Sequence, residues 1–142
     1  MALQLSALAP ELSVAGRPDH ADIDTLAKAG VRTIINNRPD GEDPGQLSAV
    51  EARRIAEARG IAYHHIPITA GTLSRGDVAA FAAVLKQASS PVVAHCRSGT
   101  RSALLWALMR MHEGADPLSL IADVARHGID IGGLPAVAAR LR

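Results

Sequence analysis

The stretch PVVAHCRSGTRSALLWALMRM, from Pro91 to Met111, constrains the fold of this chain more than any other stretch. It opens with a short apolar run that ends at His95 and Cys96, continues through a polar turn containing Gly99, and then becomes rich in Ala and Leu. This change of pattern predicts a buried strand, a tight loop and an amphipathic helix. Because such a loop directs its backbone N–H groups and the helix N-terminus at one spot, we expect it to bind anions.

Cys96 is the only cysteine of the chain, and the pattern places it at the mouth of this loop. A cysteine at a helix N-terminus beside cationic groups can have its pKa lowered from about 8.5 to roughly 3.5–7.5, which makes it a nucleophile near neutral pH. Arg101 carries a planar fork of donors that can hold an oxyanion with two hydrogen bonds. The alternative role for Cys96 is that of a small hydrophobic residue buried in the core. The His, Gly, Arg and Ser residues around it favour a reactive thiol instead.

The rest of the chain alternates between strand and helix patterns. Further strands are expected at residues 12–15, 31–36 and 61–66, and helices from Asp19 or Asp22 to about Ala29 and at residues 47–59, 74–88, 101–113, 117–126 and 134–141. This alternation predicts an α/β fold with a mostly parallel central sheet flanked by helices. We find no repeat or linker, so we expect a single domain over residues 1–142. In such sheets the active crevice lies beyond the carboxyl ends of the strands, where Cys96 is expected.

Composition and charge exclude several classes of function. The net charge is +1 with acids and bases interspersed, and only 2% of the residues are aromatic, so we expect no nucleic-acid partner. No stretch approaches the roughly 18–20 apolar residues of a membrane-spanning helix. The N-terminal stretch lacks the basic region and long apolar core of a secretion signal. Together with a free thiol, which belongs in a reducing compartment, this predicts a cytoplasmic protein.

No metal or cofactor is expected either. The phosphate-binding motif GxxxxGK[ST] is absent, as is GxGxxG after a strand. A single cysteine excludes a Cys-rich zinc site. None of the six histidines forms a pair with metal-binding helical spacing, and His64 and His65 are neighbours in an expected strand, where they point to opposite faces. The oligomeric state is not predicted by the sequence.

A polar loop follows the second expected strand and contains three acidic residues. We expect Asp40, Glu42 and Asp43 to be solvated rather than catalytic, with Asp40 kept as a candidate site residue because it follows a strand end. Arg17 and Arg38 also lie near strand ends. Either could contact a substrate, and Arg38 is a candidate site residue, although a surface position is the favoured interpretation for both.

The residues around Cys96 also carry a family resemblance. His95-Cys96, the Gly-containing loop and Arg101-Ser102 resemble the signature of cysteine-dependent phosphatases of the tyrosine and dual-specificity type. The segments LSVAGRP, VRTIINNRPDGE and IAYHHIPI precede it in order, and together they resemble the bacterial family of beta-lactamase hydrolase-like proteins with a phosphatase-like domain. The resemblance covers roughly Leu12 to Met111 and implies a protein-tyrosine-phosphatase-like fold.

The resemblance implies a role for each residue of the loop. Cys96 would be the nucleophile that forms a phosphocysteine, and Arg101 would clamp the phosphoryl oxygens. Ser102 would donate a hydrogen bond to the thiolate and help the intermediate break down. His95 would orient the loop by hydrogen bonding, or it would be a structural histidine. The anion cradle would be completed by the backbone N–H groups of Arg97, Ser98, Gly99 and Thr100.

Two departures from the phosphatase pattern keep other functions open. Four residues separate Cys96 from Arg101, one fewer than in the phosphatase signature, and CRSGTRS also resembles the persulfide loop of rhodanese sulfurtransferases. The segment IPITAGTLS, which in dual-specificity phosphatases carries the general acid, has no carboxylate, and Asp77 falls on the next helix.

We therefore expect the partner of this chain to be a phosphate- or sulfur-containing substrate. Hydrolysis of a phosphomonoester is the leading prediction, and sulfur transfer through a Cys96 persulfide is the second. The third is a non-catalytic module that binds oxyanions or phosphoproteins.

Overall fold

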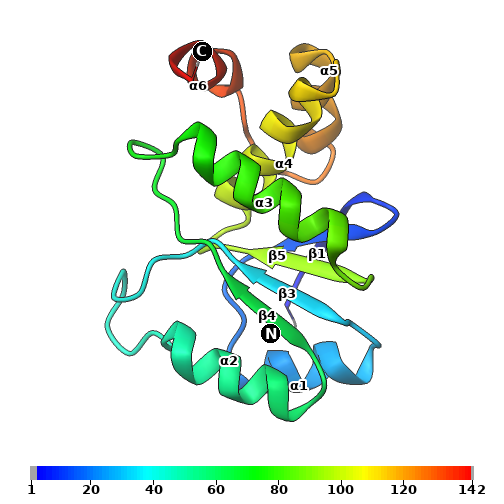
Figure 1. Ribbon diagram of the computed structural model, residues 1–142, viewed down its shortest axis with the longest axis vertical. Coiled ribbons are helices and arrows are strands. Elements are labelled where there is room, and N and C mark those ends of the chain that lie inside the picture. The colour runs from blue at the N-terminus through cyan, green and yellow to red at the C-terminus, as the bar shows by residue number, and fades with distance from the viewer. Residues whose placement is uncertain (1–2, 142) are drawn as a thin grey trace.

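Five strands form one sheet in the computed structural model, which describes residues 3–141 (Figure 1). The strand order is β1-β2-β5-β3-β4, with β1 antiparallel to β2 and all other neighbours parallel. The strands are β1 (Leu5–Ala9), β2 (Leu12–Ala15), β3 (Thr33–Asn36), β4 (Ala62–His65) and β5 (Val92–His95). The predicted mostly parallel α/β sheet is confirmed. The sequence analysis missed β1, an edge strand whose sequence LSALA lacks the β-branched residues typical of strands.

Six helices complete the fold within the described residues, and each lies within about two residues of its predicted bounds. They are α1 (His20–Lys28), α2 (Ala49–Ala58), α3 (Arg75–Gln87), α4 (Thr100–His112), α5 (Pro117–Ala125) and α6 (Leu134–Arg140). Side chains cap α1, α2, α3 and α5, because an Asp or Ser at the N-cap accepts a backbone N–H of the first turn. The cap of α1 is Asp19 rather than Asp22, and Asp77 completes the capping box of α3.

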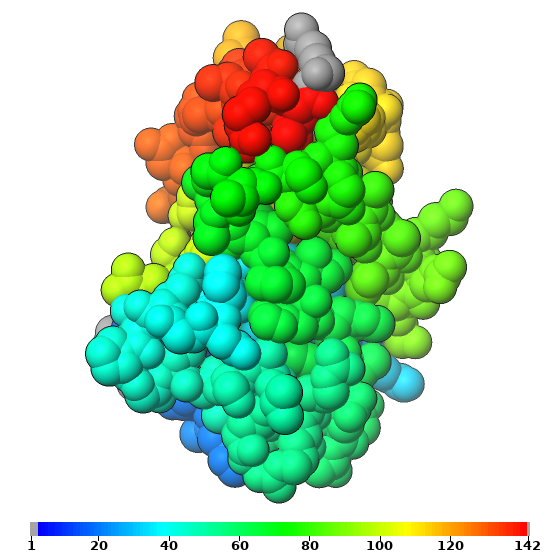
Figure 2. All heavy atoms as spheres, turned by 60° about the vertical axis from the view of Figure 1, so that its left-hand side comes forward, coloured from blue at the N-terminus to red at the C-terminus, as the bar shows by residue number. Residues whose placement is uncertain are grey.

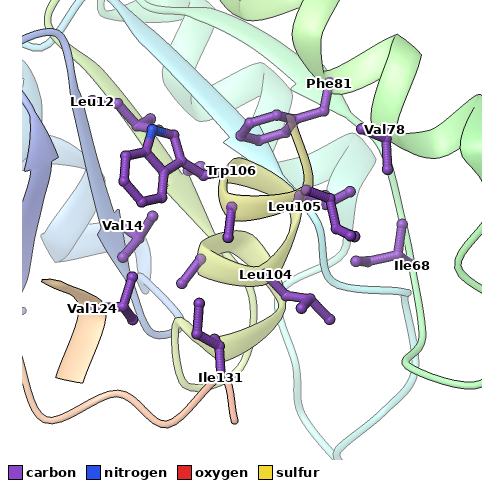
Figure 3. Packing of buried hydrophobic residues seen from close by; sticks show 14 of the residues in the cluster. Leu12, Val14, Ile68, Val78, Phe81, Leu104, Leu105, Trp106, Val124 and Ile131 are labelled. Carbon is purple, nitrogen blue, oxygen red and sulfur yellow. The ribbon is translucent and has the colours of Figure 1, made fainter. Parts of the chain in front are cut away.

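The helices cover both faces of the sheet (Figure 1). On one face, α1 and α2 pack on residues such as Ile34 and Val93. On the other face α4 is central, and Figure 3 shows side chains of β2 and α3 around it, including Leu12 and Phe81. Residues 102–108 of α4 are all buried, which is typical of a helix enclosed by protein on every side. Each large apolar side chain buried there contributes about 1.5–3 kcal/mol to stability.

The parallel strands end at one edge of the sheet. Asn36 of β3 lies between His65 of β4 and His95 of β5, and Ala15 of β2 also lies beside His95. The loops that follow these strands therefore meet at this edge. Two of these loops form the candidate site: residues 96–99, called the Cys loop, and residues 37–48, called the β3–α2 loop. Between residues 3 and 141, no helix is long and apolar enough to cross a membrane.

Candidate active site

Cys96 lies directly after β5 and is fully buried. Its Sγ accepts the backbone N–H of Gly99 at 3.0 Å. Gly99 is the N-cap of α4 and has φ of +96°, a conformation that L side chains rarely adopt, so the turn requires glycine. The predicted strand, tight loop and helix are confirmed. Unlike α1, α2, α3 and α5, α4 begins without a side-chain cap, so the N–H groups of its first turn are left for another acceptor.

The connection between β2 and α1 packs against the Cys loop. The backbone N–H of Arg17 donates to the carbonyl oxygen of Arg97 at 3.3 Å. A Cβ atom on Gly16 would lie 3.1 Å from the same oxygen, closer than most real contacts of this kind. The glycine therefore allows the backbone to approach the loop and hold its outer side.

Arg101 lies in the first turn of α4 and uses one end of its guanidinium on protein partners. Nη1 donates to Glu42 Oε2 at 2.6 Å and to the carbonyl oxygen of Ile68 at 3.0 Å, and Nη2 donates to Glu42 Oε1 at 2.8 Å. These hydrogen bonds leave Nε–H and the second N–H of Nη2, which share one edge of the guanidinium, without a carboxylate or carbonyl partner among residues 3–141. The hydrogen bonds that Arg101 donates to Glu42 are the largest cause that raises the pKa of Arg101, and the nearby Cys96 side chain adds to it.

Glu42 and Asp43 of the β3–α2 loop are partly exposed but ion-paired with arginines, which corrects the expectation that solvent alone surrounds them. Glu42 Oε1 also accepts from Arg38 Nε at 3.0 Å. The hydrogen bond from Arg101, with a further contribution from Arg38, lowers the pKa of Glu42 to about 2. Asp43 Oδ2 accepts from Arg97 Nε at 3.0 Å and pairs with Arg38. Figure 2 shows the β3–α2 loop in cyan beside the Cys loop in yellow-green.

Arg38 and Asp40, the two candidate site residues of this loop, lie in different environments. The side chain of Arg38 is only 5% exposed, so the favoured surface position was wrong. Burial is tolerated because its guanidinium is paired with two carboxylates. Asp40 is exposed, and its Oδ1 accepts the backbone N–H of Ala49 at 2.9 Å, a contact at the start of α2.

Ser102 is buried, and its hydroxyl donates to Asn37 Oδ1 at 2.8 Å. The sequence analysis did not single out Asn37, which also donates through Nδ2 to the carbonyl oxygen of Ile66 and through its backbone N–H to that of His95. Asn37 thus joins α4, β5 and the segment after β4. The hydrogen bond from Ser102 to the Cys96 sulfur stays a prediction, because the hydroxyl is directed to Asn37 in this state.

His95 is 5% exposed, and its Nδ1 lies 3.2 Å from the carbonyl oxygen of Cys96. Burial lowers the pKa of His95 to about 4, so the ring is neutral at pH 7. Because the partner is a carbonyl oxygen, Nδ1 carries the proton and donates it. His95 therefore holds the backbone of the Cys loop.

The remaining loop residues lie at the surface of the site. Arg97 and Ser98 are exposed, and Ser98 Oγ donates to Thr100 Oγ1 at 3.2 Å at the start of α4. Within the part of the chain that the structure describes, no three His, Cys, Asp or Glu side chains gather as they would around a metal ion. The arrangement is instead a sulfur and a guanidinium edge at the N-terminus of a helix, which is suited to an oxyanion.

Comparisons with known proteins agree with this geometry. The family model described as beta-lactamase hydrolase-like protein, phosphatase-like domain, matches residues 4–112. A beta-lactamase hydrolase-like protein of Agrobacterium fabrum is 39% identical over 121 residues, which are 84% of this chain. The same match covers 28% of the Agrobacterium protein, so the chain spans less than a third of that relative.

Solved structures with the same fold include known and provisional phosphatases. One from Neisseria meningitidis, described provisionally as a phosphatase, has a TM-score of 0.84 and 32% identity, covering 92% of this chain and 94% of that chain. TpbA of P. aeruginosa, solved in complex with phosphotyrosine, has a TM-score of 0.71 and 18% identity, covering 96% of this chain and 81% of that chain. The likeness to TpbA concerns the fold alone. The predicted protein-tyrosine-phosphatase-like fold is confirmed.

Proposed function

Because this chain belongs to the family of beta-lactamase hydrolase-like proteins with a phosphatase-like domain, we propose that it is a cysteine-dependent phosphatase acting on phosphomonoesters. One observation carries the proposal. The Cys96 sulfur accepts the N–H of Gly99 at the uncapped start of α4, and the guanidinium of Arg101 lies nearby with an Nε edge that neither Glu42 nor Ile68 binds. A thiolate and the three equatorial oxygens of a phosphoryl group both need such donors.

The reaction would proceed in two displacements. Cys96 Sγ attacks the phosphorus, the P–S bond forms and the P–O bond to the leaving group breaks, which gives a phosphocysteine. Water then attacks the phosphorus, the P–S bond breaks, and inorganic phosphate leaves with the thiolate restored. In both steps the Nε edge of Arg101 and the N–H groups of the Cys loop would stabilise charge on the equatorial oxygens.

Glu42 supports this reaction by positioning Arg101. It binds the Nη1 and Nη2 end of the guanidinium and leaves the Nε edge for substrate. Its pKa of about 2 keeps it ionised at neutral pH, so it does not supply a proton to the leaving oxygen. The segment 66–74, between β4 and α3, contains no Asp or Glu. We therefore expect fast turnover only for esters with activated leaving groups, such as 4-nitrophenyl phosphate.

Hydrolysis of 4-nitrophenyl phosphate tests this function. The wild-type protein should release phosphate, vanadate should block it, and Cys96→Ser should lower the rate about 1000-fold or more, as removal of a catalytic nucleophile does. Mass spectrometry of acid-quenched protein should detect one added phosphoryl group on Cys96. A Cys96→Ser protein with the wild-type rate would refute the proposal.

Sulfur transfer is the second candidate, and the short spacing of Cys96 and Arg101 favours it. A tighter ring of N–H groups suits a persulfide sulfur at least as well as a phosphoryl group. Cys96 would attack the outer sulfur of thiosulfate, release sulfite and carry a persulfide, and cyanide would then remove that sulfur as thiocyanate. Thiocyanate formation, with one added sulfur on Cys96, identifies this activity.

The two assays are run side by side on the wild-type protein and Cys96→Ser. A protein that fails both and still binds phosphate or sulfate through Arg101 would be a binding module. Because a free reactive thiol needs a reducing environment, we place the activity in the cytoplasm.

A further inference from the structure

A cavity of about 630 Å³ adjoins the Cys loop, a size typical of small-molecule sites. It lies on the face of the sheet that α1 and α2 cover, and its lining is mixed, with apolar residues such as Leu47 beside polar ones such as Asn36 and Gln46. His95 and Arg97, which flank Cys96 in the sequence, line the same cavity. Cys96 and Arg101 are not among the lining residues, so the cavity borders the Cys loop through the residues on either side of Cys96.

Two exposed arginines line this cavity. The side chain of Arg17 is 60% exposed, and its contact with Asp43 is an ion pair of 3.8 Å, longer than a hydrogen bond. The side chain of Arg97 is 57% exposed and uses only Nε on Asp43 among the residues that the structure describes. Most of the N–H donors on these two guanidinium groups are therefore uncommitted.

The carboxylates that line the cavity already have partners. Asp19 and Asp22 form the capping box of α1, in which each side chain accepts the backbone N–H of the other residue. Asp43 lies between Arg38 and Arg97. Among the described residues, Arg17 and Arg97 are exposed arginines of the lining that keep N–H donors for a ligand, so the rim favours an anion even though acidic residues are present.

We propose that this cavity binds the organic part of the substrate and that Arg17 and Arg97 bind a second anionic group on it. The substrate class is then a small organic phosphate that carries a further carboxylate or phosphate. This inference rests on the proposed function, because the Cys loop must hold the reacting phosphoryl group while the rest of the molecule lies in the cavity.

Binding to the Cys96→Ser protein, which separates recognition from turnover, tests the inference. The probes are phenylphosphonate and its three carboxylated forms, with the carboxylate ortho, meta or para to the phosphonate. At least one carboxylated probe should bind about tenfold more tightly than phenylphosphonate, the size of one charge-assisted hydrogen bond. Adding Arg17→Ala should reduce that advantage to less than about threefold. Isothermal titration calorimetry gives each dissociation constant.

Arg32→Ala is the matched control, since Arg32 is exposed and lines a separate cavity near the amino ends of β3 and β4. It should keep the advantage of the carboxylated probe. Equal affinities for all four probes, or an advantage that Arg17→Ala leaves unchanged, would overturn the inference.

Turnover of 4-nitrophenyl phosphate separates this outcome from failure of the proposed function. If the wild-type protein hydrolyses that ester while the carboxylate gives no advantage, only the second-anion site is refuted. If hydrolysis is absent and the carboxylate advantage depends on Arg17, the cavity binds the anion and the phosphatase chemistry is refuted.

Discussion

The Cys loop and the β3–α2 loop lie at the same edge of the sheet, but they contribute to the site in different ways. The Cys loop presents a sulfur and backbone N–H groups, and the N–H that binds the sulfur comes from Gly99, a neighbour in the sequence. The β3–α2 loop contributes side chains, Glu42 and Asp43, whose partners Arg97 and Arg101 are more than fifty residues away. The first loop would supply the chemistry, and the second would fix the charges around it. Substitutions that affect the two loops should therefore lower the catalytic rate or the stability by different amounts.

Arg101→Lys should have the largest effect of the variants that keep the nucleophile. Lysine replaces a planar fork with a point charge, so it cannot bind Glu42 and a phosphoryl group through two parallel pairs of hydrogen bonds. We expect kcat/KM for 4-nitrophenyl phosphate to fall about 100-fold and the affinity for vanadate to fall with it. Unchanged vanadate affinity would remove Arg101 from the anion site.

His95 should make the stability of the protein dependent on pH. Its folded pKa of about 4 is below the ordinary value of 6.5, so the unfolded state binds more protons between these values. Stability is therefore fully present above pH 6.5 and should fall by about 3 kcal/mol as the pH drops to 4. Urea denaturation at pH 7, 5.5 and 4.5 measures it. The slope should be smaller in His95→Gln, and an equal slope in both proteins would contradict the assignment.

Glu42→Gln tests whether the β3–α2 loop positions Arg101. The amide keeps the shape but loses the charge and one acceptor, so the guanidinium is held less firmly. We expect kcat/KM to fall about tenfold, a loss comparable to one charge-assisted hydrogen bond. Glu51→Gln is the matched control, because Glu51 pairs with Arg54 on the surface of α2, and it should keep the wild-type rate. Equal rates in the two variants would show that the pairing with Arg101 has no catalytic consequence.

The smallest effect is expected from Gly16→Ala. The new Cβ would press on the carbonyl oxygen of Arg97 and shift the Cys loop by a few tenths of an ångström. We expect kcat/KM to fall about threefold, because small displacements of a positioned group lower the rate. Gly71→Ala, whose added Cβ meets nothing within 4 Å, should leave the rate unchanged. If both substitutions have the same effect, the close approach is not what holds the loop.

The same comparison explains what the sequence predicted and what it did not. Periodicity over residues 91–111 predicted β5, the turn and α4, because these depend on local pattern and on Gly99. The role of Glu42 depends on β3 lying beside β5 in parallel register, with Asn36 next to His95. That pairing joins strands that are far apart in the sequence, so it cannot be seen in the composition of the β3–α2 loop. The composition alone predicted that the acidic residues of this loop are solvated. The burial of Arg38 and the contacts of Asn37 were missed for the same reason.

The enclosure of α4 has a consequence for how the molecule fluctuates. Local opening of a protein usually begins at exposed, weakly packed elements and spares the most enclosed ones. Since residues 102–108 of α4 are buried, their amide protons should be among the slowest to exchange with deuterium. Arg101 directly precedes this segment. Transient unfolding of α5 or α6 should therefore leave the position of the Arg101 guanidinium relative to the Cys96 sulfur unchanged.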